Sequence, residues 1–240
     1  MTNKIKYSFL FPYYDRHIQF IETLESFLGF YKGRNDYEVV IVEDAKNVAD
    51  PIKHALFIHL INMFATEIPI RHVRFPLAVV NPSGMFNMAA KLAKGEYVIL
   101  SSPECRHETD ILIGLDEEFA KKPNAYVICA CQSLKADGTF HMWYQHSIHR
   151  NAKYHFCSII SKDTWEAIGG FDEAYQYGYC FDDDDLRDTI LNSNIPVVVC
   201  DDLLVSHQWH SKAYRPANWK LLWEENKKIY EAKFGKYVEQ

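Results

Sequence analysis

The apolar positions of this chain fall into short uninterrupted runs separated by longer stretches of mixed character. The runs are rich in Val, Ile and aromatic residues and end in turn or acidic residues, which is typical of buried strands. Between them, apolar residues recur every three or four positions, as in helices with one buried face. In the first half of the chain this pattern predicts strands at residues 5–11, 37–42, 68–75, 96–100 and 125–131. The intervening helices are expected to begin after Asp15 and at Pro51, Ser83 and His107.

Strands and helices that alternate in this way form βαβ units with a parallel sheet and right-handed crossovers. Such sheets bind ligands at the carboxyl ends of their strands. The polar residues at those ends are Tyr13, Tyr14, Asp15 and Arg16 after the first strand, Glu43 and Asp44 after the second, and Ser102 and Glu104 after the fourth. Acids at several strand ends indicate a site for a cation and a nucleotide.

Gly95 is expected to end the third helix of the first half as a left-handed C-cap.

The second half of the chain is less regular. Beyond residue 131, the pattern predicts strands at residues 139–146, 155–160, 196–200 and 203–205, and helices at 162–168, from Asp182, and at 218–234. We expect one α/β domain over residues 1–240, with a nucleotide-binding half at 1–104 and a mixed acceptor half at 105–240.

Four consecutive acids, Asp182 to Asp185, stand at the start of one predicted helix. Adjacent carboxylates repel one another, so folding alone gives no reason for this run. A divalent cation, a proton to be abstracted or a polyhydroxyl ligand would give one. An acidic first turn that complements the helix dipole is the structural alternative. Both interpretations can hold, because a helix can begin at a cleft.

Composition narrows the class of protein. With 48% hydrophobic and 24% charged residues, the chain is typical of a soluble globular protein. A net charge of −6 without a basic stripe argues against tight non-specific binding to nucleic acid or anionic lipid. The six cysteines form no C-x-x-C pair, which favours free thiols in a reducing compartment. No apolar stretch is long enough for a transmembrane segment, and the one ending at Pro12 is too short for a signal peptide, so we expect a cytoplasmic protein.

The order of motifs resembles the family 2 glycosyltransferases of the GT-A fold, which transfer a sugar from a nucleotide-diphosphate donor. Residues 8–16 (SFLFPYYDR) are similar to the first-strand signature of that family, and residues 38–44 (EVVIVED) to its second strand. Residues 87–98 resemble its Asn-bearing helix and the strand that precedes its metal motif. Residues 169–173 (GGFDE) and 181–186 (FDDDDL) match two later blocks, and the second also resembles a galactosyltransferase-type C-terminal region.

This resemblance covers roughly residues 5–210 and implies an α/β GT-A fold. In that fold a mostly parallel, Rossmann-like central sheet is flanked by helices and followed by a mixed acceptor-side half. The implied activity is an inverting, metal-dependent transfer of a sugar, with a UDP-sugar as the expected donor. The resemblance places the donor on Pro12, Tyr13, Tyr14, Arg16, Glu43, Asp44, Asn87, Ser102 and Pro103.

Several of these donor-binding residues have a second, structural role as an alternative. The Asp44 carboxylate is suited to accept a hydrogen bond from the imide N–H of uracil. Glu43 either contacts the ribose or has only a structural role. Arg16 either pairs with a phosphate or forms a surface salt bridge. Asn87 either holds a loop over the diphosphate or bonds within its own helix.

The metal motif of the family, Asp-x-Asp, falls on Ser102-Pro103-Glu104, and only the last position keeps a carboxylate. In this fold that last acid is the usual metal ligand. We expect Mn²⁺, or Mg²⁺, bound by Glu104 with His207 or His210, since imidazole suits a transition ion better than Mg²⁺. His207 is favoured because it follows an apolar strand directly. The alternative is a pair of half-buried histidines beside Trp209.

The resemblance assigns the general base to Asp183, and Asp182 to a hydrogen bond with the acceptor sugar. Clustered negative charges are expected to raise the pKa of one carboxylate, which suits a base near neutral pH. A single base that activates the acceptor for direct displacement implies inversion at the anomeric carbon. For Asp184 we expect only helix capping and solvation.

The acceptor is a glycan or another hydroxyl compound, and a modified nucleic-acid base is not supported by the charge. The candidates for an aromatic sugar-binding wall are Trp143, Tyr144, Tyr177, Tyr179 and Trp209, and core packing is the expected role of at least half of them. Two other functions compete. A sugar-phosphate nucleotidyltransferase would open with a Gly-rich loop after its first strand, and residues 12–16 contain no Gly. A non-catalytic glycan-binding homologue would explain Ser102.

Overall fold

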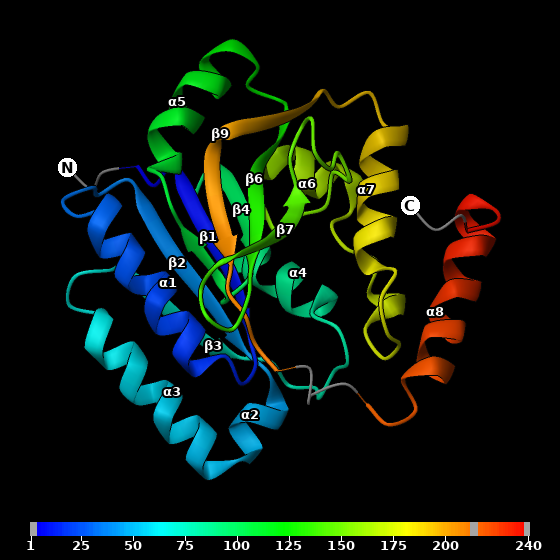
Figure 1. Cartoon of the computed structure of the whole chain (residues 1–240), viewed down its shortest axis with the longest axis horizontal. Helices are drawn as coiled ribbons and strands as arrows, with labels where there is room; N and C mark the ends of the chain where they lie inside the picture. The colour runs from blue at the N-terminus through cyan, green and yellow to red at the C-terminus, as the bar shows by residue number, and fades with distance from the viewer. Residues whose placement is uncertain (1–3, 212–215, 238–240) are drawn as a thin grey trace.

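A computed structural model describes residues 4–211 and 216–237. Within these residues a nine-stranded sheet has the order β3-β2-β1-β4-β8-β6-β9-β5, with β7 paired to β6 (Figure 1). Its first four strands run parallel and are β3 (Ile70–Arg74), β2 (Tyr37–Glu43), β1 (Tyr7–Tyr13) and β4 (Tyr97–Ser101). The α/β architecture with helices flanking a central sheet is therefore confirmed.

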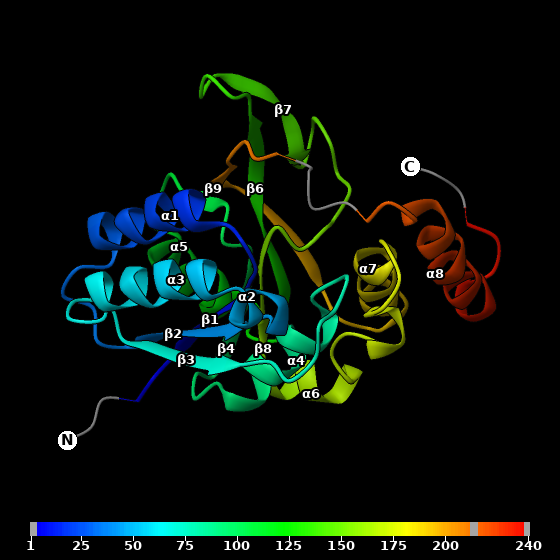
Figure 2. The same ribbon diagram turned by 90° about the horizontal axis from the view of Figure 1, so that it is seen from below.

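Helices cover both faces of the sheet (Figure 2). One face packs its aromatic side chains, among them Phe9 and Phe11, against α1 (His17–Phe30), α3 (Pro51–Phe64) and α5 (Ile111–Lys121). The other face packs against α4 (Ser83–Leu92), α6 (Lys162–Ile168) and α7 (Asp182–Asn192). These two buried clusters supply the apolar burial that drives folding. A short helix, α2 (Ala45–Ala49), connects β2 to α3.

The sheet becomes mixed in its second half. β8 (Cys157–Ser161) lies antiparallel between β4 and β6 (Tyr126–Leu134). β6 runs parallel to β9 (Val197–His207), and the three-residue strand β5 (Cys105–His107) pairs antiparallel with the end of β9. Because Cys105 pairs with His207, the segment that leaves β4 meets the segment that leaves β9.

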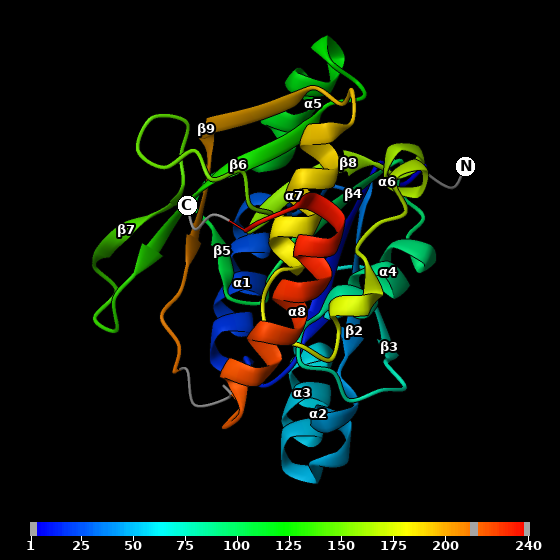
Figure 3. The same ribbon diagram turned by 90° about the vertical axis from the view of Figure 1, so that its right-hand side faces the viewer.

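Two peripheral elements complete the structure. β7 (Phe140–Gln145) pairs only with β6 among the described strands and projects away from the helices (Figure 2). α8 (Trp219–Phe234) packs outside α7 (Figure 3), through a small cluster that joins Phe181 and Tyr175, of the 3-10 turn Glu173–Tyr175, to Tyr230. Among the described helices, none combines the length and the apolar character that crossing a bilayer requires.

Several predicted boundaries were wrong for identifiable reasons. His107 does not begin a helix but ends β5, and α5 starts at Ile111 because Asp110 caps it by accepting from the Leu112 and Ile113 amides. The strands predicted at 196–200 and 203–205 are one strand, β9, which continues across a bulge opposite Cys129 and Ala130. Asp15 does not cap α1, whose N-cap residue is Arg16.

Gly95 does not have the predicted role of a left-handed helix cap. α4 ends at Leu92, with Ala93 in an extended conformation at the C-cap. Gly95 instead lies against β1, where its amide donates to Ser8 Oγ at 2.8 Å. A Cβ atom at Gly95 would lie 2.7 Å from both the backbone nitrogen and the Oγ of Ser8. The position therefore requires glycine because two backbone segments approach closely.

We predict that Gly95→Ala lowers the free energy of unfolding by about 1–3 kcal/mol, because β1 has to shift to admit the methyl group. Gly29→Ala is the matched control, since a Cβ atom at that α1 position would meet nothing within 4 Å apart from the helix's own backbone. The control should leave stability unchanged or raise it by up to about 1 kcal/mol. Urea denaturation measures both, and equal midpoints for the two variants would contradict the close approach.

Candidate active site

A cleft of about 320 Å³ lies at the carboxyl ends of β1, β2 and β4. One wall comes from the ends of these strands and the other from the loop before α4 and from Tyr179. Its lining residues are Pro12, Tyr13, Tyr14, Arg16, Asp44, Lys46, Val79, Val80, Asn81, Pro82, Met85, Ser102, Pro103, Glu104, Tyr179 and Pro216. The residues predicted to bind a donor all line this cleft except Glu43 and Asn87.

Glu43 lies behind the cleft rather than in it. Its carboxylate is fully buried and accepts from Asn47 Nδ2 at 2.6 Å, and it also contacts ring nitrogens of His54 at 2.8 Å and His72 at 3.0 Å. Burial alone would raise the pKa of Glu43, but the hydrogen bonds from His72, His54 and Asn47 outweigh it and hold the pKa below its usual value. In this arrangement Glu43 ties β2 to its neighbours, which fits the structural alternative.

Asn87 is also occupied elsewhere. Its Oδ1 accepts from the Phe171 amide at 3.0 Å, and its Nδ2 donates to the Phe171 carbonyl and to Glu173, both at 2.9 Å. The side chain therefore fastens the Gly169-Gly170 turn to α4. It neither bonds within its own helix nor reaches the cleft.

Asp44 and Lys46 form the cleft wall after β2. The Asp44 carboxylate accepts from the backbone amides of Lys46 at 2.6 Å and Val79 at 3.4 Å, and burial raises its pKa. The Lys46 ammonium lies 5.3 Å from the centre of the Tyr14 ring and donates to the Val79 carbonyl. The sequence analysis missed Lys46, because no local pattern marks it as a residue of the cleft.

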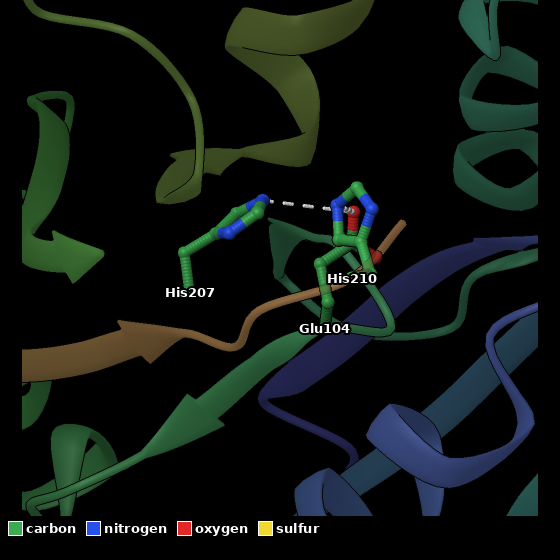
Figure 4. Close-up of side chains that lie close together, drawn as sticks. All are labelled: Glu104, His207 and His210. Atoms are coloured by element: carbon green, nitrogen blue, oxygen red, sulfur yellow. Dashed lines mark ion pairs between the residues drawn. The ribbon is translucent and has the colours of Figure 1, made fainter. Parts of the chain in front are cut away.

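Glu104, His207 and His210 converge at the edge of the cleft (Figure 4). Each offers one ligand atom, and these atoms all lie within 4.8 Å of one another. Glu104 Oε1 is 3.7 Å from His207 Nε2 and 3.6 Å from His210 Nε2. Glu104 also lines the cleft, and Arg16 Nε lies 3.8 Å from the same carboxylate. The structure thus brings together the residues that the sequence analysis named as metal ligands.

The surroundings of His207 favour the neutral imidazole that metal binding requires. Burial is the main cause that lowers the pKa of His207 below its usual value, so its ring is neutral near pH 7. His210 Nδ1 lies 3.1 Å from the Ser211 carbonyl, and a ring that donates from Nδ1 carries its lone pair on Nε2, toward Glu104. One carboxylate and two imidazoles fit a transition ion such as Mn²⁺.

The four acids at the start of α7 lie in different environments. Asp182 is buried, and burial together with the charge of Asp183 raises its pKa well above the usual value. Asp184 does not have the solvated capping role that was expected, because it is buried and its Oδ1 accepts from Tyr154 at 2.8 Å and Arg187 at 3.0 Å. Asp185 accepts from Tyr175 and Lys233.

Asp183 is the only acid of the run that is not buried, and its side chain is 44% exposed. Its Oδ1 lies 3.8 Å from His155 Nε2, whose ring packs against Phe86 and Phe171. Asp183 itself does not line the cleft. Tyr179, three residues before α7 begins at Asp182, does line it, so the loop that leads into α7 contributes to the cleft wall.

The aromatic residues considered for sugar binding are scattered. Tyr179 lines the cleft, and Tyr177 and Trp209 are exposed. Tyr144 packs on Phe156 and His207, which places it behind the candidate metal ligands. Trp143 stacks on His149 in the projecting β7 region. They do not form a single wall.

The sequence matches no protein-family model, and the search of curated proteins gave no match. Structural comparison does find similar proteins. The chain resembles S. aureus TarS 1-349 in complex with UDP-GlcNAc, with a TM-score of 0.70 and 14% identity, over 91% of this chain and 64% of that one. The same protein in complex with UDP gives a TM-score of 0.68 and 15% identity, over 85% of this chain and 61% of that one.

A third similar structure is the mannosyltransferase PcManGT from Pyrobaculum calidifontis in complex with GDP-Man and Mn²⁺. Its TM-score is 0.65 at 14% identity, over 92% of this chain and 61% of that one. The chain therefore spans about three fifths of the length of these proteins, and its coverage of TarS 1-349 in a further structure is 60%. The similarity establishes the fold: this chain shares the fold of TarS and of the mannosyltransferase PcManGT.

Proposed function

We propose that this protein is an inverting, metal-dependent glycosyltransferase that uses a nucleotide-diphosphate sugar, with one GT-A domain over residues 1–240. One observation carries the proposal. Glu104, His207 and His210, far apart in sequence, meet at the edge of a cleft whose lining includes most of the residues predicted for the donor. The structural neighbours with bound UDP-GlcNAc or GDP-Man support the same class of ligand.

The donor is proposed to be a UDP-sugar. The Asp44 carboxylate accepts two backbone hydrogen bonds and has lone pairs left for a further one, which the imide N–H of uracil can donate. Lys46 and Arg16 line the same cleft and supply positive charge for the phosphates. Ser102 offers a hydroxyl where an acid stands in the family motif, which fits contact with ribose.

The metal is proposed to be Mn²⁺, held by Glu104 with His207 and His210. When bound, such an ion neutralises charge that develops on the leaving diphosphate. Asp183 is proposed as the general base that takes the proton from the acceptor hydroxyl. Its carboxylate stands in the first turn of α7, and its side chain is 44% exposed, so an acceptor hydroxyl can reach it. Direct displacement by the activated hydroxyl inverts the anomeric centre. The free cysteines fit a reducing compartment, and we propose the cytoplasm.

Mn²⁺ binding tests the metal site directly. We predict that Glu104→Gln weakens Mn²⁺ binding by about a hundredfold or more, since loss of outer-shell partners alone costs about 10–100-fold. Glu108→Gln is the matched control, because Glu108 pairs with Arg106 and does not line the cleft. Isothermal titration of wild type and both variants, with UDP present, measures the affinities. Equal affinity in wild type and Glu104→Gln would contradict the site.

The pH dependence of Mn²⁺ binding follows from His207. Its lowered pKa keeps the imidazole neutral and able to bind metal at pH values where an exposed histidine is already half protonated. We therefore expect Mn²⁺ affinity to be constant from about pH 8 down to about pH 6.5 and to fall only in more acidic solution. A tenfold loss of affinity between about pH 8 and about pH 6.5, measured by the same titration, would be inconsistent with a buried neutral ligand.

Asp183→Asn tests the base without requiring the acceptor to be known. Hydrolysis of UDP-sugars by water, measured as UDP release in Mn²⁺, should fall by about 10²–10⁴-fold in kcat because the base is lost. Donor binding, measured by the rise in melting temperature with UDP and Mn²⁺, should persist because Asp183 lies outside the cleft lining. Wild-type hydrolysis rates in Asp183→Asn would remove Asp183 from the mechanism.

A further inference from the structure

One face of α1 is bonded to both segments that carry the candidate metal ligands. Gln19 and Thr23, one helical turn apart on this face, contact residues 103 and 208–209. Arg16, at the N-terminal end of the same helix, lies 3.8 Å from Glu104. The site is thus built against a helix that contributes none of the metal ligands.

Thr23 joins the two segments through a single hydroxyl group. Its Oγ1 donates to the Pro103 carbonyl at 2.8 Å, next to Glu104, and accepts from Gln208 Nε2 at 3.1 Å. A threonine inside a helix usually bonds the carbonyl four residues earlier, so this long-range use is unusual. Thr23 is fully buried, so a lost partner here is not replaced by bulk water.

Gln208 stands in the segment that carries both histidines, and its side chain turns to α1 rather than to the cleft. Its amide donates to Thr23 Oγ1 and, at 2.9 Å, to the Gln19 carbonyl, and the residue is 5% exposed. Its backbone amide donates to the Glu104 carbonyl at 2.9 Å. The same residue therefore fixes the histidine segment to α1 through its side chain and to the Glu104 segment through its backbone.

Together these bonds form a closed loop of Thr23, Pro103, Glu104 and Gln208. Two segments joined only by their own backbones could slide relative to each other, which would change the distances between Glu104 and the two histidines. A third attachment to a helix removes that freedom. Neutral donors and acceptors suit this role, since they add no charge that would compete for a cation.

We propose that Thr23 and Gln208 are positioning residues that preorganise the metal site by fixing the Glu104 segment against the His207–His210 segment. This inference deepens the proposed function and rests on it where metal affinity is concerned. The geometric part, the restraint on residues 103–104 and 207–210, stands independently and has its own measurement.

Thr23→Val removes the hydroxyl at nearly constant volume, and Gln208→Met removes the amide. Each should weaken Mn²⁺ binding by about 10–100-fold, as loss of an outer-shell partner does. Thr23→Ser keeps the hydroxyl and should restore affinity to within about threefold of wild type. Thr164→Val is the matched control, because its hydroxyl bonds Ser161 at the start of α6 and touches neither segment. It should leave Mn²⁺ affinity unchanged.

Hydrogen exchange without metal provides the second measurement. In Thr23→Val, amides of residues 104–108 and 205–210 should exchange faster, while the rest of the sheet stays protected. Unchanged exchange and unchanged Mn²⁺ affinity in Thr23→Val would overturn the positioning role. Equal weakening in Thr164→Val would reduce it to general stability and also overturn it. If wild type binds no Mn²⁺, the proposed function fails, and local exchange alone then decides whether the two residues restrain the segments.

Discussion

The antiparallel pairing of β5 with β9 is the interaction on which the candidate site depends. It sets Cys105, at the start of β5, opposite His207, at the end of β9. Glu104 directly precedes Cys105, so its carboxylate lies next to histidines that come about a hundred residues later in the chain. A register slip of one residue would turn alternate side chains to the other face and separate the carboxylate from the imidazoles. The parallel half of the sheet forms the cleft, but this short pairing places the metal ligands beside it.

Burial, rather than residue type, divides the acids of this protein into different roles. Glu43 is enclosed by hydrogen-bond donors and acts as a structural tie. Asp184 and Asp185 are paired with Arg187 and Lys233, so their charges are satisfied within the α7 region. Asp183 and Glu104 keep accessible or partly accessible carboxylates, which leaves them able to meet a ligand.

The sequence was most informative where the signal was local. Buried parallel strands are continuous apolar runs, so their carboxyl ends, and with them Asp44 and Glu104, were identified without a structure. His207 and His210 were named from ligand chemistry and from their place after an apolar strand, whereas the β5–β9 pairing that brings them to Glu104 is a long-range contact that the pattern does not encode. Lys46 was missed because its role depends on the loop before α4 folding back across the cleft, a long-range contact that periodicity does not encode.

Local patterns also gave wrong results where tertiary contacts decide the outcome. His107 stands next to a helical sequence, yet strand pairing and the Asp110 cap assign it to β5.

The most direct test of the account is anomalous diffraction from crystals soaked with Mn²⁺ and UDP. We expect a manganese peak bonded to Glu104, to at least one of His207 and His210, and to the diphosphate in the adjoining cleft. A manganese peak at Asp182–Asp185, or UDP bound away from this cleft, would contradict it.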